Sequence, residues 1–319
     1  MKKIILKNQF NTVETANLVL GENGITDPKK KDFIFRYMDE YLELGGNCFD
    51  TARLYGGGQS EYALGEYLSN KKREDIVIVT KCGHHKLNMV NPPSRLSKEE
   101  ITGDLETSLT ALKTDYTDIL FLHRDDIKIP VCEIMPVLDR LVRDGKVRVL
   151  GASNWTGGRI AEANKFATDN NLTPFSVSQI SWSLALTTAA QTRDLTHIIM
   201  DKAESTWYCE NNFAVMAWSA SAKGFFTTAA AGGELKPTPG QRYAFLEENF
   251  RRAERAKILS EKYNVEVGSI VLAYVMCSPF PGAAVTAFST MQQFYEAIEA
   301  TKIELTDEDI KFLEDGGKG

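Results

Sequence analysis

Four side chains suited to proton transfer stand at or just after the ends of three short apolar runs. The run NCFD ends in Asp50, IVIVTK ends in Lys81 and DILFLH ends in His123, while Tyr55 follows shortly after Asp50. A phenol normally ionises only near pH 10, and an ammonium within hydrogen-bonding range favours its ionised form. Asp50 would keep Lys81 charged, because an isolated buried ammonium tends to lose its proton. This set of residues indicates a tyrosine that exchanges a proton near neutral pH.

Each of the four also has an ordinary structural explanation. Asp50 could cap the following turn, and a lysine at a strand end is usually solvated. His123 could be a core histidine, and Tyr55, which precedes three glycines, could simply pack against them. Only their joint occurrence at the ends of consecutive strands favours catalysis.

Short apolar segments that read as strands alternate with helical segments along the whole chain. Strands that alternate with helices imply βα units and a parallel sheet. Eight such strands predict an α/β fold, a (β/α)8 TIM barrel that forms a single domain over residues 1–319, with its active site at the C-terminal ends of the strands. The predicted strands are 16–20, 47–50, 76–81, 118–123, 149–154, 176–181, 214–219 and 283–288.

Several connecting segments carry helix or loop signals. Residues 133–144 place their apolar side chains on one helical face, and Gly145 follows as a stop signal. Pro136 is expected near the first turn of that helix, and Ser97 is expected to cap a helix over 99–112. The glycine- and proline-rich segment 220–241 predicts a long loop, of the kind that often forms a lid.

Composition narrows the class of protein. The chain has 319 residues, 43% hydrophobic content and a net charge of −6, which disfavours nucleic acid and anionic membranes as partners. No stretch approaches the ~20 apolar residues of a membrane-spanning helix, and the N-terminus lacks the pattern of a signal peptide. Five cysteines without CxxC spacing predict a reduced, cytoplasmic protein. No metal site is predicted, because His84-His85 has no further ligand at metal-binding spacing, and the sequence carries no signal for an oligomeric state.

The stretch FDTARLYGGGQSEYALG fits the pattern FDTAxxYGxGxSExxLG. This pattern is specific to the aldo-keto reductase superfamily, which the chain therefore resembles. The resemblance extends over nearly the whole chain and is strongest to bacterial members of uncertain substrate. It implies that Asp50, Tyr55, Lys81 and His123 form the catalytic tetrad, with Tyr55 as general acid in reduction and His123 directing the carbonyl oxygen. The implied activity is that of an NAD(P)(H)-dependent oxidoreductase. It would interconvert a small-molecule carbonyl, an aldehyde or ketone and possibly a sugar, with its alcohol by hydride transfer.

The resemblance also implies a dinucleotide site. Three groups would bind the nicotinamide carboxamide, an aromatic ring would stack on the nicotinamide where relatives more often have tyrosine, a loop would cross the pyrophosphate, and a segment after the eighth strand would hold the adenosine half. In that order these are Ser153, Asn154 and Gln179; Trp218; Ser219, Ala220, Ser221, Lys223 and Gly224; and Ala287, Phe288, Ser289, Gln293 and Glu296. The chain has no GxGxxG fingerprint next to a strand in a Rossmann setting.

Cofactor preference follows from a departure from the family pattern. NADP-dependent relatives usually place Lys or Arg in the segment that corresponds to residues 287–293, which here carries no positive charge. A 2′-phosphate requires such a cation. NADP(H) is therefore expected from the family and NAD(H) from this uncharged loop, unless Arg251 or Arg252 supplies the charge.

The residues expected to line the substrate pocket favour one class of substrate, and two other functions stay open. The substrate pocket would draw on Leu54, Trp155, Trp182 and the loop 88–95, a mixture of aromatic and polar groups that suits a carbohydrate. One alternative is a cofactor-sensing regulatory barrel with little turnover, similar to potassium-channel β subunits. A second is a lyase in which Lys81 forms a Schiff base, which borohydride trapping would distinguish.

Overall fold

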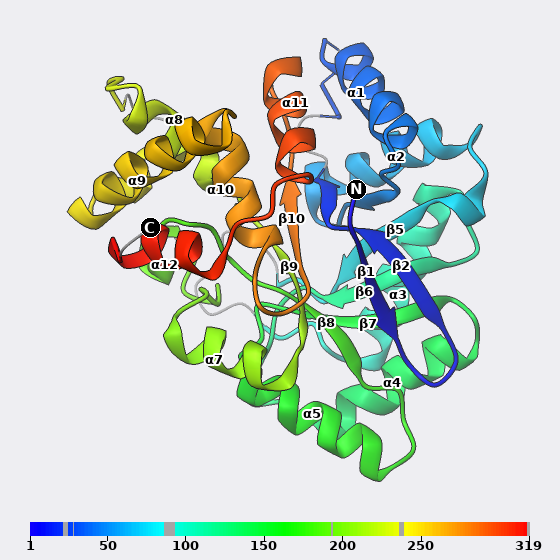
Figure 1. Cartoon of the computed structure of the whole chain (residues 1–319). Coiled ribbons are helices and arrows are strands. Elements are labelled where there is room, and N and C mark those ends of the chain that lie inside the picture. Colours follow the sequence, from blue (N-terminus) through cyan, green and yellow to red (C-terminus); the bar gives the residue numbers. More distant parts are fainter. Residues whose placement is uncertain (22–24, 28, 86–92, 193, 236–238, 318–319) are drawn as a thin grey trace. The chain divides into compact units, whose positions relative to one another are not determined.

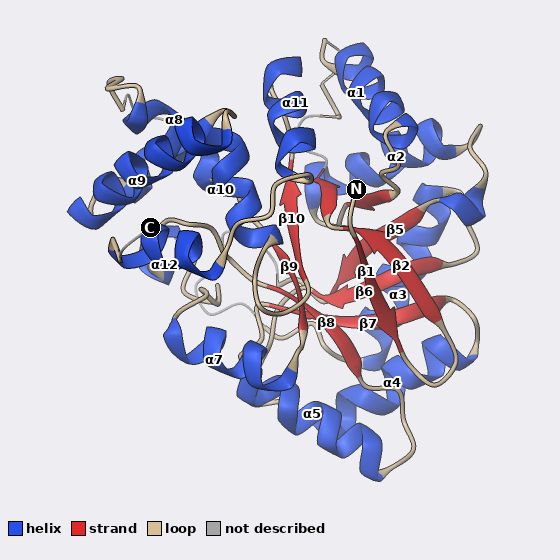
Figure 2. Cartoon of the chain, in the orientation of Figure 1, coloured by secondary structure: helices blue, strands red, loops and turns tan. Residues whose placement is uncertain are grey.

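The computed structural model describes residues 1–21, 25–27, 29–85, 93–192, 194–235 and 239–317. Eight strands form a closed parallel barrel in the order β10-β3-β4-β5-β6-β7-β8-β9, so the predicted (β/α)8 barrel is confirmed (Figures 1 and 2). The barrel strands are β3 (Leu18–Gly21), β4 (Cys48–Asp50), β5 (Val77–Cys82), β6 (Thr117–Leu122), β7 (Val147–Ser153), β8 (Phe175–Gln179), β9 (Ala214–Ala217) and β10 (Gly282–Thr286).

All eight barrel strands were predicted, and their predicted ends differ from the observed ones by at most two residues. His123 and Trp218 lie just past the ends of β6 and β9 instead of inside them. Asn154 follows β7 and has a φ of 57°, a left-handed conformation that no strand continues through. His123 and Asn154 are thus the first residues of connecting loops, whereas Asp50 and Lys81 lie within β4 and β5.

An N-terminal hairpin was not predicted. β1 (Lys3–Lys7) pairs antiparallel with β2 (Thr12–Ala16), and its buried residues alternate with exposed ones, as a half-buried strand requires. Asn8 fixes the turn by accepting hydrogen bonds from the backbone N–H groups of Phe10 and Asn11, each at 2.9 Å. Figure 1 shows this hairpin, in dark blue, beside the strands β5, β7 and β8 that it contacts.

The chain divides into two compact units. The N-terminal unit, residues 3–16 and 20–179, contains β4–β8 and the helices that pack against their outer face and one another (Figure 2). Its helices are α1 (Lys31–Glu43), α2 (Gln59–Leu68), α3 (Lys98–Leu112), α4 (Val131–Arg143) and α5 (Gly157–Asp169), with short 3-10 turns η1 (Tyr55–Gly58) and η2 (Arg73–Asp75). That the whole chain acts as one domain stays a prediction.

The C-terminal unit comprises residues 1–2, 17–19 and 180–319. Helices α8, α9 and α10 pack together, and α12 packs on α9. The helical elements are α6 (Ala189–Thr192), α7 (Lys202–Asn211), α8 (Phe225–Ala230), α9 (Glu247–Tyr263), α10 (Val267–Met276), α11 (Met291–Ala300), α12 (Asp307–Asp315), η3 (Ala222–Gly224) and η4 (Pro239–Tyr243). No helix in the described ranges is both long and apolar enough to cross a membrane.

The prediction of one long irregular loop over 220–241 is wrong. The segment contains η3, α8 and the start of η4. Helix α8 forms because Phe225 and Phe226 are buried, and Phe225 packs against the rings of Tyr243 and Phe250. Two adjacent phenylalanines in a run of small residues supply enough apolar area to fix this helix.

Two predicted helix signals are confirmed and a third needs correction. Ser97 caps α3 by accepting a hydrogen bond from Glu100 N. Gly145, at a φ of 75°, follows α4 and donates its N–H to the carbonyl of Val142. Pro136, expected near the first turn, lies inside α4 because this helix begins earlier, at Val131.

Candidate active site

A buried lysine–aspartate pair forms the centre of the site in the N-terminal unit. The Lys81 ammonium at the end of β5 donates to both carboxylate oxygens of Asp50, at 2.9 and 2.8 Å, and to the carbonyl of Thr51 at 2.7 Å. The two side chains are 0% and 4% exposed. Burial alone would lower the pKa of Lys81, but Asp50 first and Tyr55 second raise it above its ordinary value. The pairing with Asp50 thus favours the charged form of Lys81.

Tyr55 and His123 lie around this cation. The Lys81 ammonium is 4.8 Å from the centroid of the Tyr55 ring, and the Tyr55 and His123 rings meet edge to face at 5.9 Å. His84 packs edge to face against His123 at 4.6 Å and is buried. The structure brings together all four residues of the predicted tetrad.

Gln179 bonds to the tetrad. Its amide Nε2 donates to Asp50 Oδ1 at 2.8 Å, so Asp50 accepts from both an ammonium and an amide. Ser153 donates its hydroxyl to the Gln179 carbonyl at 3.0 Å, and Asn154 Nδ2 donates to Ser153 Oγ at 3.1 Å. The three residues predicted to bind a carboxamide form one connected set, with the Gln179 donor engaged by Asp50.

The loop after His123 holds the backbone of this residue through a hydrogen bond from Arg124. Arg124 is buried and donates to the His123 carbonyl at 2.8 Å. Burial raises the pKa of Asp125 to about 6, although Arg159 opposes the shift. The Arg159 Nε lies 3.4 Å from Asp125 Oδ2. The polar side chains after β6 thus pair within the protein.

The predicted substrate residues divide into buried and accessible groups. Trp155 is fully buried and packs on Phe175 at 5.4 Å. Trp182, in the C-terminal unit, is 8% exposed and packs against Tyr274 and Phe280. Core packing of both tryptophans argues against the predicted substrate contact. Leu54 is half-buried beside Tyr55, and residues 86–92 of the predicted substrate loop lie outside the described residues.

In the C-terminal unit, the loop after β9 has an unusual backbone. Ser219, Ala222 and Lys223 have φ values of 60°, 47° and 52°, a region that costs L-residues about 1–2 kcal/mol each. The other described non-glycine residues with positive φ, apart from Asn154, stand at helix C-termini. Such strain clusters at functional sites. Trp218, at the start of this loop, is half-buried and packs on His197 at 4.7 Å.

Two cations face one another at this loop. The residue Lys223 is exposed as a whole, but the protein packed around its ammonium and, secondly, the Arg242 guanidinium hold the pKa of Lys223 below its usual value. Neither Lys223 nor Arg242 has a carboxylate within 4.0 Å among the residues described, and Arg242 Nε is buried without a hydrogen-bond partner there. Adjacent unpaired cations favour binding of an anion.

The segment after β10 carries no cation. Phe288 is buried against Phe294, whereas Ala287 is half-buried. Gln293 accepts a hydrogen bond from the Ser289 N–H at 2.8 Å. Burial raises the pKa of Glu296, and Gln292 Nε2 lies 3.4 Å from its carboxylate.

The two arginines considered as replacement cations are engaged elsewhere. Arg251 pairs with Glu247 at 2.7 Å, and Arg252 donates to the Leu184 carbonyl at 2.7 Å. Arg242, which the sequence analysis did not single out, lies close enough to the loop after β9 to lower the pKa of Lys223. The only sequence signal for Arg242 is that it directly precedes an aromatic residue, Tyr243, in a segment that contains glycine and proline.

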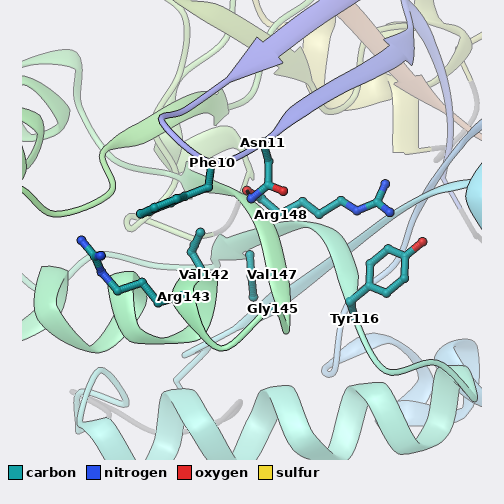
Figure 3. A pocket seen from close by; sticks show the side chains of 8 residues that line it. All are labelled: Phe10, Asn11, Tyr116, Val142, Arg143, Gly145, Val147 and Arg148. Carbon is teal, nitrogen blue, oxygen red and sulfur yellow. Dashed lines mark hydrogen bonds between the residues drawn. The ribbon is translucent and has the colours of Figure 1, made fainter.

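A separate pocket of about 510 Å³ lies at the N-terminal ends of β6 and β7, in the N-terminal unit (Figure 3). Its arginines are already paired, Arg148 with Asp118 at 3.1 Å and Arg143 with Asp139 at 2.6 Å. The pocket is at the opposite end of these strands from His123 and Ser153, and it is not the candidate active site. The remaining lining residues are Phe10, Asn11, Tyr116, Val142, Gly145 and Val147.

Comparisons with known proteins agree with this geometry. A sequence model of the Aldo/keto reductase family matches residues 17–315. The norsolorinic acid reductase of Aspergillus flavus is 30% identical over 302 residues, which cover 92% of this chain and 74% of that protein. An aryl-alcohol dehydrogenase of Pestalotiopsis microspora is 31% identical over 296 residues, covering 90% and 73%. An uncharacterised oxidoreductase of Bacillus subtilis is 27% identical over 316 residues, covering 95% and 92%.

Among solved structures, a thermostable aldo-keto reductase in complex with the inhibitor epalrestat is similar, with a TM-score of 0.74. It is 22% identical, and the match covers 99% of this chain and 100% of that one. At this identity the similarity shows the fold alone.

Proposed function

The chain belongs to the aldo/keto reductase family, and we propose that it reduces aromatic aldehydes or ketones, or oxidises the matching alcohols, with Tyr55 as the proton donor. Membership and relatives make it an oxidoreductase that acts on CH–OH and C=O groups. The family generally uses NAD(P)H, which supplies the hydride when bound. The single observation that carries the role of Tyr55 is the buried Lys81–Asp50 pair directly beside its ring.

The chain's own residues account for the proton. The Lys81 cation stabilises negative charge on the Tyr55 oxygen, so the phenol can release its proton to a developing alkoxide. Asp50 holds Lys81 in place, and the Gln179 amide helps satisfy the buried carboxylate. His123 stands next to Tyr55 and directs the carbonyl oxygen towards the phenol.

The residues present fit a dinucleotide. Ser153, Asn154 and Gln179 offer hydroxyl and amide groups for a carboxamide. The unpaired Lys223 and Arg242, together with the strained loop that bears Lys223, fit a diphosphate. We propose that Trp218 stacks on the nicotinamide ring, and that residues 287–296 hold the adenosine half.

Cofactor preference is proposed to be weak, with NADH accepted. A charge-assisted hydrogen bond to a 2′-phosphate contributes ~1.5–3 kcal/mol, or roughly ten- to more than hundredfold in affinity. The segment 287–293 has no cation to make that bond, and Arg251 and Arg252 are engaged elsewhere. Titration of Trp218 fluorescence with each dinucleotide tests this proposal, because a stacked ring should be quenched.

Two variants distinguish binding of the diphosphate from binding of the 2′-phosphate in that titration. Arg242→Met should lower the affinities for NADH and NADPH by the same factor, since both dinucleotides carry the diphosphate. Ala287→Lys should raise the affinity for NADPH alone. An NADPH dissociation constant about a hundredfold below that of NADH in the unaltered protein would contradict the proposal.

An aromatic substrate is favoured over a sugar. Burial of Trp155 and Trp182 removes the surface on which a sugar was expected to stack, and two relatives are named for aryl alcohols and for norsolorinic acid. The test is a panel of aryl aldehydes, aryl ketones and sugars assayed by NAD(P)H absorbance. Faster turnover of sugars would contradict the substrate class. Tight dinucleotide binding without turnover of any carbonyl would favour the regulatory alternative.

A further inference from the structure

One fully buried carboxylate outside the tetrad has two partners that both border catalytic residues. Glu61, in the first turn of α2, is 0% exposed. Its Oε2 accepts a hydrogen bond from Arg53 Nη1 at 2.5 Å, and its Oε1 accepts one from the Thr80 hydroxyl at 2.6 Å. Both carboxylate oxygens are therefore used inside the protein.

The first partner controls the turn that carries Tyr55. Arg53 precedes Tyr55 by two residues, and its Nη2 donates to the carbonyl of Gly57, two residues after Tyr55, at 3.4 Å. The Arg53 backbone N–H also reaches the Lys81 carbonyl at 3.4 Å. Arg53 thus spans the turn on which the phenol stands.

The second partner controls the strand that carries Lys81. Thr80 is the residue before Lys81 on β5 and is fully buried. Neighbouring side chains on a strand point to opposite faces. Lys81 therefore reaches Asp50 on one face of β5, while Thr80 reaches Glu61 of helix α2 on the other.

The glycines after Tyr55 make room for this contact. Gly56, Gly57 and Gly58 have φ values of 57°, 63° and 93°. A Cβ at Gly58 would stand 1.7 Å from Arg53 Nη2, so any other residue there would displace the guanidinium. The glycine run thus permits both the tight turn and the Arg53–Glu61 pair.

We propose that Glu61 is a positioning residue, which sets the distance between the Tyr55 phenol and the Lys81 ammonium through Arg53 and Thr80. The inference rests on the proposed role of Tyr55 as proton donor. One carboxylate links the Tyr55 turn to the Lys81 strand, so loss of either hydrogen bond lets the two elements move independently.

The test is Glu61→Gln, which keeps the side-chain volume but cannot accept both hydrogen bonds as a carboxylate does. We expect kcat to fall about 10- to 100-fold, the effect of a displacement near 1 Å, with dinucleotide affinity unchanged. The pH–rate profile should shift in the same variant. The ionisation of Tyr55, followed as the tyrosinate absorbance lost on Tyr55→Phe, should also move to higher pH.

Asp139 provides the matched control. It is a buried carboxylate that likewise accepts from an arginine and a threonine, Arg143 at 2.6 Å and Thr173 at 2.8 Å. Asp139→Asn should lower stability and leave kcat and the pH profile as they were. If Glu61→Gln behaves as this control does, Glu61 is merely structural and the proposal is overturned.

Two further outcomes are decisive. Should Glu61→Gln not fold, Thr80→Val removes only the hydroxyl donor, and an unchanged kcat and pH profile in that variant would overturn the proposal. Should the unaltered protein turn over no carbonyl, the proposed function fails. The tyrosinate titration of Glu61→Gln or Thr80→Val still decides whether Glu61 positions Tyr55 against Lys81.

Discussion

Replacing Lys81 with methionine should destabilise the fold by about 3 kcal/mol, the lower end of the ~3–5 kcal/mol expected when one partner of a buried ion pair is removed. The variant leaves the Asp50 carboxylate buried without its counter-ion, and it removes three hydrogen bonds of 2.7–2.9 Å. The lower end applies because Gln179 still donates to Asp50, and a hydrogen bond to a charged group contributes about 1.5–3 kcal/mol.

The pH dependence of that difference has a definite sign. The pKa of Lys81 is raised in the folded protein above its ordinary value of 10.5. Its contribution is therefore complete below that value and is lost only as the pH rises through the folded-state value. The free-energy difference between the two proteins should thus be flat across neutral pH as far as Lys81 is concerned.

Urea unfolding followed by tryptophan fluorescence measures the effect. Lys165→Met is the matched control, because Lys165 also pairs with an aspartate, Asp169, at 2.7 Å, but the two side chains are 76% and 56% exposed. It should cost less than about 1 kcal/mol. Asp50→Asn in the Lys81→Met background should recover part of the lost stability. A cost below about 1 kcal/mol for Lys81→Met would refute the buried pair as described.

Two further perturbations test the electrostatics. Asp125 is 12% exposed and has a pKa of about 6, so folding favours its protonated form and the free energy of unfolding falls as the pH rises from 4 to 6. In urea unfolding, the change in that free energy caused by Asp125→Asn should therefore be more stabilising at pH 7 than at pH 4, by about 1–3 kcal/mol. An effect that does not depend on pH would contradict this. Burial alone would raise the pKa of Asp309, but Lys262, Tyr263 and Thr306 lower it to about 2. Asp309→Asn should therefore lower stability at neutral pH by about 2 kcal/mol. Thermal unfolding should show that the stability difference between variant and unaltered protein vanishes as the pH falls from 4 to 2. A difference that persists at pH 2 would argue against the hydrogen bonds from Lys262, Tyr263 and Thr306.

The grouping of the four candidate catalytic residues was predictable because its signal is local. Asp50, Lys81 and His123 each follow an apolar run that reads as a strand, and the C-terminal ends of barrel strands meet at one face. Tyr55 stands within a pattern specific to the family. Strand order and residue type were sufficient for these four positions.

Other features depend on tertiary contacts that no local pattern encodes. Nothing near Gln179 indicates that its amide donates to Asp50, far away in sequence. Trp155 was predicted to line the substrate pocket, yet packing on Phe175 buries it. Arg242 is a candidate anion ligand only because η4 places it near Lys223.

Periodicity also failed where the apolar signal was short. Phe225 and Phe226 alone distinguish α8 from the glycine- and proline-rich loop around it. The strand Lys3–Lys7 does alternate with period two, but it is only five residues long and no strand was predicted there. In both cases burial against a neighbouring element, and not intrinsic propensity, determined the structure.

The central claim is that Tyr55 donates the proton in carbonyl reduction. Tyr55→Phe keeps the ring and its packing beside Lys81 and His123 and removes only the hydroxyl. The decisive measurement is kcat of this variant with an aryl aldehyde, alongside the dinucleotide dissociation constant from tryptophan fluorescence. The proposed mechanism predicts a kcat lower by about 10²- to 10⁴-fold with an unchanged dissociation constant, and a variant that reduces carbonyls at nearly the rate of the unaltered protein would contradict it.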